Sequence, residues 1–92
     1  MKPLIKICGI KDFNTLNQLI ELEAIDFIGF IFFRKSPRNV SNGFLNKVNG
    51  INLQNKRAVC VYVDATKEFI QQTSSNFENP ILQFHGNESN DF

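Results

Sequence analysis

The stretch Phe27–Phe33 constrains the fold of this chain more than any other segment does. Its residues, Phe-Ile-Gly-Phe-Ile-Phe-Phe, include no polar side chain. An apolar run of this length predicts a strand that is covered on both faces, which is typical of parallel sheets. Parallel neighbours need long crossover connections, usually helices. We therefore expect the flanking segments to alternate between strand and helix.

The remaining segments follow this alternation. Asp12, Ser41 and Thr66 each precede a stretch with helical spacing of apolar residues and are suited to cap a helix. The first of these helices is expected to run to about Glu23. Further strands are expected at residues 4–8, where Gly9 ends the run, and at 58–63 and 81–84. The pattern is βαβαβαβ, which implies an α/β fold with right-handed parallel crossovers.

The repeat length leaves two architectures open. A spacing of roughly 25 residues per strand and helix suits a (β/α)8 barrel of about 250 residues, and it suits a small open α/β sheet equally well. Residues 1–92 are enough for one small domain, with 42% apolar residues for its core. The segment after Gly86 resembles the start of a fourth helix, cut before its apolar face. The domain is therefore expected to be truncated.

Composition excludes several functional classes. A net charge of +1 gives no reason to expect nucleic acid or a membrane surface as a partner. Two cysteines do not form a disulfide framework, and we see neither a signal peptide nor a membrane-spanning run. A cytoplasmic protein with reduced thiols is expected. The chain has no Cys/His ligand spacing and no Gly-rich phosphate loop, so no metal and no cofactor are expected.

Polar residues share one face of the first strand. Lys6 and Cys8 point one way, while Ile5 and Ile7 point the other way and are expected to pack on helices. A lysine within an apolar strand needs water, a counter-charge or a ligand. Gln83 and His85 repeat the pattern on the last strand. We expect these faces to line one polar interior.

Three motifs carry a resemblance to a known family. They are Lys6-Ile7-Cys8-Gly9-Ile10, the segment Ile28–Phe32 leading into Lys35-Ser36-Pro37-Arg38, and Leu82–Glu88. In this order and spacing, the chain resembles the phosphoribosylanthranilate isomerases of tryptophan biosynthesis. The resemblance spans the whole chain but only the amino-terminal half, or slightly less, of the family's (β/α)8 barrel. The chain departs from the family at Lys11 and Arg34, where the family usually has Thr and Pro, and at Cys60 and Asp64.

The resemblance implies an Amadori rearrangement of N-(5'-phosphoribosyl)anthranilate to 1-(2-carboxyphenylamino)-1-deoxyribulose 5-phosphate. It implies that Cys8 is the base that removes the C2' proton. A thiol must be partly ionised to do this, and Lys6 could supply a cation that favours ionisation. Arg38 would bind the anthranilate carboxylate, for which a guanidinium is well shaped. His85 and Gln83 would face the substrate.

Each residue also has a simpler interpretation. A strand cysteine such as Cys8 is commonly a small core hydrophobe, and Cys60, flanked by valines, is expected to be one. Arg38 could belong to a solvated basic loop with Arg34 and Lys35. His85 could be a local hydrogen-bonding group at a strand end.

Parts of the family's site are missing from these 92 residues. The family's general acid is an aspartate at the end of the fifth strand, and barrel phosphate sites come from the loops after strands seven and eight. We therefore expect little or no activity from this polypeptide alone. Four parallel strands also leave two open edges, which favours a complementary carboxyl-terminal half-barrel or self-association. The alternative function is a non-catalytic half-barrel that binds a partner or a small ligand.

Overall fold

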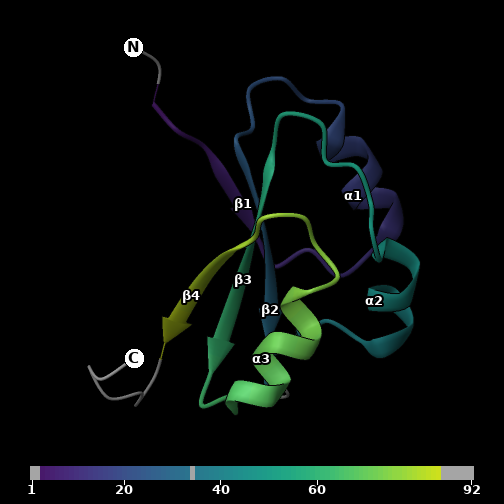
Figure 1. The fold of residues 1–92 in the computed structure, drawn as a ribbon. Helices are drawn as coiled ribbons and strands as arrows, with labels where there is room; N and C mark the ends of the chain where they lie inside the picture. The colour runs from purple at the N-terminus through teal and green to yellow at the C-terminus, as the bar shows by residue number, and fades with distance from the viewer. Residues whose placement is uncertain (1–2, 34, 86–92) are drawn as a thin grey trace.

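The structure is a computed structural model that describes residues 3–33 and 35–85. Strands and helices alternate along the chain, as the sequence predicts (Figure 1). The strands are β1 (Lys6–Cys8), β2 (Phe27–Phe32), β3 (Arg57–Val63) and β4 (Ile81–His85), and the helices are α1 (Phe13–Ile20), α2 (Asn42–Val48) and α3 (Lys67–Ser74).

The strand order decides between the two architectures. The four strands are parallel and lie in the order β1-β2-β3-β4. In Figure 1 the helices lie on one side of this sheet. A doubly wound open sheet reverses its strand order and carries helices on both faces. The chain instead winds in one direction, which confirms the expected partial (β/α)8 barrel.

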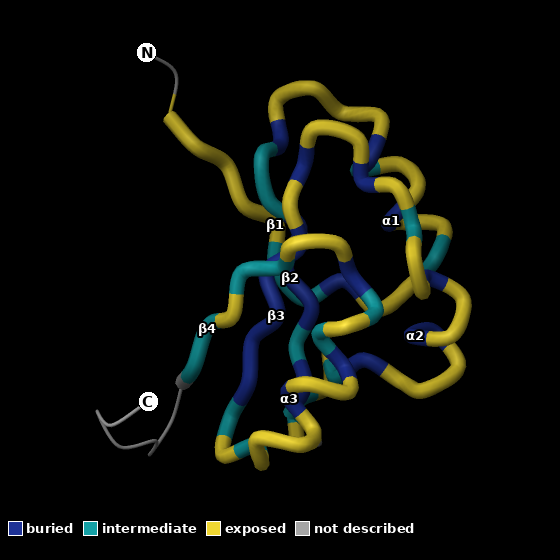
Figure 2. Tube along the Cα trace, in the orientation of Figure 1, coloured by how far each residue is buried: buried dark blue, intermediate teal, exposed yellow. Residues whose placement is uncertain are grey.

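The core lies between the sheet and the helices. Alternate residues of β2 and β3 belong to the core on the helix side: Ile28, Phe30, Phe32, Ala58, Cys60 and Tyr62. Val59 and Val61 on the other side of β3 are buried as well, so β3 is buried along most of its length (Figure 2). Phe30 stacks on Phe77 with ring centroids 4.6 Å apart, and Phe32 stacks on Tyr62 at 5.1 Å. The helices and their connections contribute the other side of this core: Leu16, Ile20, Phe44, Leu45, Val48 and Ile70.

The helix starts confirm the predicted caps. The side chain of Asp12 accepts a hydrogen bond from the backbone N–H of Thr15, and Ser41 and Thr66 cap α2 and α3 in the same way. The end of α1 was not predicted correctly, because the helix stops at Ile20 rather than near Glu23. Leu22, which we expected to extend its apolar face, is 50% exposed and stabilises no further turn.

The first strand departs from the prediction in its packing. We expected Ile5 and Ile7 to pack on helices, but they are 38% and 36% exposed. Strand β1 pairs only with β2 in the described part of the chain and lies at the edge of the sheet. The buried core covers the helix-facing sides of β2 and β3, not that of β1. The isoleucine face of β1 is therefore an exposed apolar surface.

None of the helices within residues 3–33 and 35–85 combines the length and the apolar character required to cross a membrane.

Two ionisable groups of the core predict a pH-dependent stability. Burial raises the pKa of the Cys60 thiol to about 12, and burial also raises the pKa of the Tyr62 hydroxyl. Unfolded cysteine loses its proton near pH 8.5. Above that pH the unfolded state releases a proton that the folded state retains, so the free energy of unfolding should fall as pH rises. The slope is at most about 1.4 kcal/mol per pH unit for each group.

Urea unfolding at about pH 8 and about pH 10.5 measures this loss. At the lower pH the Cys60→Ala variant should be less stable than the parent chain, because the substitution leaves a small cavity. Between the two pH values it should lose less stability than the parent chain does. An identical loss in the variant and the parent chain would contradict the assignment to Cys60.

Candidate functional site

The face of the sheet opposite the helices is concave and polar at its two edges. The Lys6 Nζ atom on β1 donates a hydrogen bond to Oε1 of Gln83 on β4, at 3.0 Å. Two strands separate β1 from β4, and side chains stand roughly perpendicular to a sheet. Such side chains meet only where the sheet curves so that they converge, as it does in a barrel. The contact places Lys6 and Gln83 on the same concave face, as the alternation of side chains along the two strands predicts.

The Cys8 thiol lies beside a glycine of the next strand. Cys8 is a free, half-buried cysteine, and its register partner on β2 is Gly29. A Cβ atom built on Gly29 would lie 2.7 Å from Sγ of Cys8 and 3.0 Å from its Cα. Only glycine therefore leaves room for the thiol here. Sequence reasoning missed this contact, although a glycine within an apolar strand is a signal for such a close approach.

Arg38 reaches the end of β1 from the loop after β2. Gly9 follows Cys8 and has a φ of 91°, which side chains rarely adopt. A Cβ atom on Gly9 would lie 2.5 Å from Cδ of Arg38 and 3.4 Å from its Nη1. The arginine stem thus lies against the backbone of the residue next to Cys8. The structure thus places Arg38 against the residue that directly follows Cys8.

A second contact joins the same two loops. The Nζ atom of Lys11 donates a hydrogen bond to the carbonyl oxygen of Pro37, at 2.6 Å. The backbone N–H of Arg38 donates to Oγ of Ser36 at 3.1 Å. Sequence reasoning missed the Lys11 contact, because 26 residues separate its partners and neither one belongs to a recognisable pair.

The other candidates differ in position. His85 is the last residue of β4, and its side chain lies outside the described part of the structure. Cys60 is fully buried on the helix-facing side of β3, which confirms it as a core residue. Lys35 is exposed, as expected, and Arg34 lies outside the described residues.

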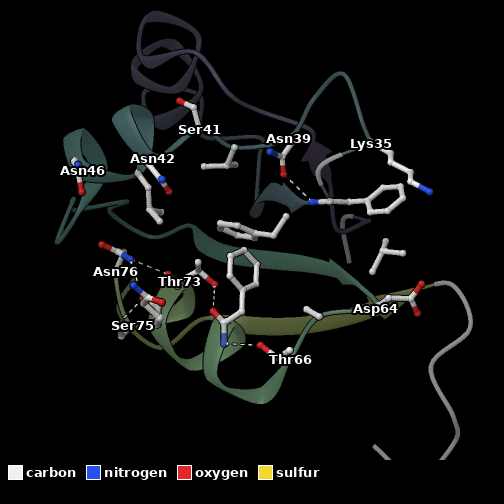
Figure 3. A pocket seen from close by; sticks show the side chains of 18 residues that line it. Lys35, Asn39, Ser41, Asn42, Asn46, Asp64, Thr66, Thr73, Ser75 and Asn76 are labelled. Carbon is white, nitrogen blue, oxygen red and sulfur yellow. Dashed lines mark hydrogen bonds between the residues drawn. The ribbon is translucent and has the colours of Figure 1, made fainter.

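A hollow between two helices is separate from this site. A cavity of about 1150 Å³ opens between α2 and α3, and its lining includes neither Cys8 nor Arg38 (Figure 3). Three of its polar side chains stabilise the fold: Ser41 and Thr66 cap helices, and Thr73 bonds to Tyr62 at 2.7 Å. The candidate residues Lys6, Cys8 and Gln83 lie instead on the concave side of the sheet.

The chemistry available at this site is acid–base and ionic. The described residues hold no cluster of three or more His, Cys, Asp or Glu side chains that could bind a metal ion. They offer a thiol, an ammonium group and a guanidinium group. A thiolate accepts protons, and a guanidinium forms paired hydrogen bonds with a carboxylate. The set suits proton transfer on a carboxylate-bearing ligand.

The Gly29 contact makes a direct prediction. Gly29→Ala should lower the free energy of unfolding by about 1–3 kcal/mol, because the new methyl group overlaps the backbone and the thiol of Cys8. Gly43→Ala is the matched control. Gly43 lies in α2 with open space where a Cβ would stand, so alanine should stabilise the helix by about 0.5–1 kcal/mol. Urea unfolding of both variants is the measurement, and two changes of the same sign would contradict the prediction.

Comparisons with known proteins identify the family of the chain. A family model described as N-(5'phosphoribosyl)anthranilate (PRA) isomerase matches residues 5–92. The N-(5'-phosphoribosyl)anthranilate isomerase of Rhizobium leguminosarum is 39% identical over 89 residues, which are 97% of this chain and 40% of the relative. The corresponding isomerase of Agrobacterium fabrum is 37% identical over the same shares.

A solved structure extends the agreement to the fold. The crystal structure of phosphoribosyl anthranilate isomerase from Thermotoga maritima matches with a TM-score of 0.78 and 28% identity. The match covers 96% of this chain and 42% of that protein. The chain thus spans about two fifths of the length of the relatives it matches. By the family model, the relatives and the fold, this chain belongs to the N-(5'-phosphoribosyl)anthranilate isomerase family.

Proposed function

We propose that residues 1–92 form a single partial barrel domain that carries the amino-terminal part of a phosphoribosylanthranilate isomerase site. The reaction is the Amadori rearrangement of N-(5'-phosphoribosyl)anthranilate to 1-(2-carboxyphenylamino)-1-deoxyribulose 5-phosphate, a step of tryptophan biosynthesis. The observation that carries the proposal is the placement of the Arg38 stem on Gly9, directly beside Cys8. It brings a thiol and a guanidinium-bearing side chain to the same end of β1, which supports the proposal that they act on one substrate.

Each residue has a distinct role in the proposal. Cys8 acts as the general base that removes the C2' proton of the ring-opened imine, for which its thiolate is suited. Arg38 binds the anthranilate carboxylate through paired hydrogen bonds. Lys6 and Gln83, which contact each other across the concave face, line the substrate site, and His85 closes the strand beside them.

The proposal needs a second part of the barrel. The family's general acid and its phosphate-binding loops come from strands beyond these residues, so the chain alone should have little or no activity. Apolar side chains are exposed at both edges of the sheet, with Ile7 on β1 36% exposed and Leu82 on β4 40% exposed. A complementary carboxyl-terminal half-barrel, or a second copy of this chain, would cover these edges. We place the protein in the cytoplasm, where thiols stay reduced.

Complementation tests the proposal. The chain is expressed in a tryptophan auxotroph that lacks this isomerase, alone and together with the carboxyl-terminal half of the Rhizobium relative. We expect growth without tryptophan only when both halves are present. The same pair carrying Cys8→Ala should not support growth, although the variant chain remains soluble.

The possible outcomes separate the two functions. Growth that depends on Cys8 supports an isomerase half-site. Growth of the Cys8→Ala pair would contradict the role of the base. No growth from two soluble halves would favour the alternative, a half-barrel that binds a partner or a small ligand. The exposed edges of the sheet would still need a partner to cover them.

A further inference from the structure

We infer that Lys11 is a positioning residue, which holds Arg38 in place beside Cys8. Its Nζ atom donates to the carbonyl oxygen of Pro37, at 2.6 Å. That carbonyl belongs to the peptide unit that joins Pro37 to Arg38. A hydrogen bond there fixes the start of the Arg38 residue, and it comes from the connection that follows β1. The inference rests on the proposed function, because it concerns how Arg38 is held at the proposed site.

The loop that carries Arg38 has its own internal hydrogen bonds. The Arg38 N–H donates to Ser36 Oγ at 3.1 Å, and the Phe33 N–H donates to Asn39 Oδ1 at 2.8 Å. These bonds set the shape of the loop, but they do not fix its distance from the end of β1. The Lys11 bond does so, because it spans the two loops.

A second contact points to the same arrangement. The Arg38 stem lies against Gly9, whose missing side chain leaves the space for it. The Lys11 hydrogen bond holds the backbone of Arg38, and the contact with Gly9 holds its side chain. An arginine loses considerable rotamer freedom when it binds a ligand, and a side chain that is already ordered loses less. The two contacts therefore prepare the guanidinium for a carboxylate.

The loop itself gives the first test. Amide hydrogen exchange is measured in the chain and in its Lys11→Met, Lys11→Arg and Lys67→Met variants. Methionine keeps the apolar stem and removes the donor, whereas arginine keeps a donor. Lys67 is an exposed lysine at the start of α3 and serves as the matched control. We expect the Arg38 amide to exchange about two- to tenfold faster in Lys11→Met alone.

Ligand binding gives the second test. The probe is anthranilate, which is fluorescent and carries the carboxylate, and aniline is the control because it lacks that group. Lys11→Met should weaken anthranilate binding about two- to tenfold, and Lys11→Arg should restore most of it. In the Arg38→Met background the Lys11→Met change should have no further effect, because a positioning residue acts only through its partner.

The results distinguish the inference from the function on which it rests. An Arg38 amide that exchanges equally fast in the chain and in Lys11→Met would overturn the inference. An equal loss of anthranilate binding with and without Arg38 would also overturn it, because Lys11 would then contact the ligand directly. If Lys11→Met speeds exchange but the unaltered chain does not bind anthranilate, the positioning role is supported and the proposed carboxylate contact fails.

Discussion

Cys8→Ala should lower kcat of the reconstituted isomerase by a factor of about 100 to 10,000, the usual contribution of a positioned general base. The enzyme for this experiment consists of the chain together with the carboxyl-terminal half of the Rhizobium relative. The methyl group of alanine cannot accept the C2' proton. KM should stay within about threefold, because the proposed carboxylate contact is made by Arg38 and is retained. Steady-state kinetics on the purified pair is the measurement.

The second cysteine of the chain is the control for this experiment. Cys60 is fully buried on the helix-facing side of β3, whereas Cys8 is half-buried on the concave side. Cys60→Ala should therefore lower stability and leave kcat unchanged at a temperature where the variant is folded. Cys8→Ala should lower kcat and leave the stability nearly unchanged. If Cys60→Ala lowers kcat as much as Cys8→Ala does, the effect belongs to the fold and Cys8 is not the base.

The sequence predicted the features that depend on local chemistry. Asp12, Ser41 and Thr66 were predicted as helix caps, because a short polar side chain before an apolar helical pattern has few other uses. The alternation of faces along two strands predicted that Lys6 and Gln83 share a polar side, and the structure joins them by a hydrogen bond. In each case the signal lies within a few residues, or in a period that repeats.

The features that sequence reasoning missed depend on distant contacts. The Lys11–Pro37 bond joins two loops, and nothing near either residue marks it. The exposure of Ile5 and Ile7 depends on which strands the helices cover. Periodicity predicts which residues of a strand share a face. Whether helices cover that face depends on how the whole sheet is packed.

Phe30→Ala should have the largest effect on stability, a loss of about 3–5 kcal/mol. Phe30 is fully buried in the middle of β2, and its ring stacks on Phe77 at 4.6 Å and packs against Phe44 at 6.2 Å. Alanine would remove this packing and leave a cavity among three structural elements that cannot all move inward. A domain of this size is stabilised by roughly 5–14 kcal/mol in total. The variant should therefore lose a large part of the stability of the chain.

A second phenylalanine shows whether burial causes this loss. Phe69 on α3 contacts Tyr62 and Phe32 edge to face at 6.2 Å, but it is 39% exposed. Phe69→Ala removes the same number of atoms and leaves a space that water can enter, so its cost should be about 1–2 kcal/mol. Urea unfolding followed by circular dichroism compares the two variants. Removing a fully buried ring should lower the free energy of unfolding more than removing a ring that borders solvent. Equal losses in the two variants would therefore show that burial of Phe30 does not cause the effect.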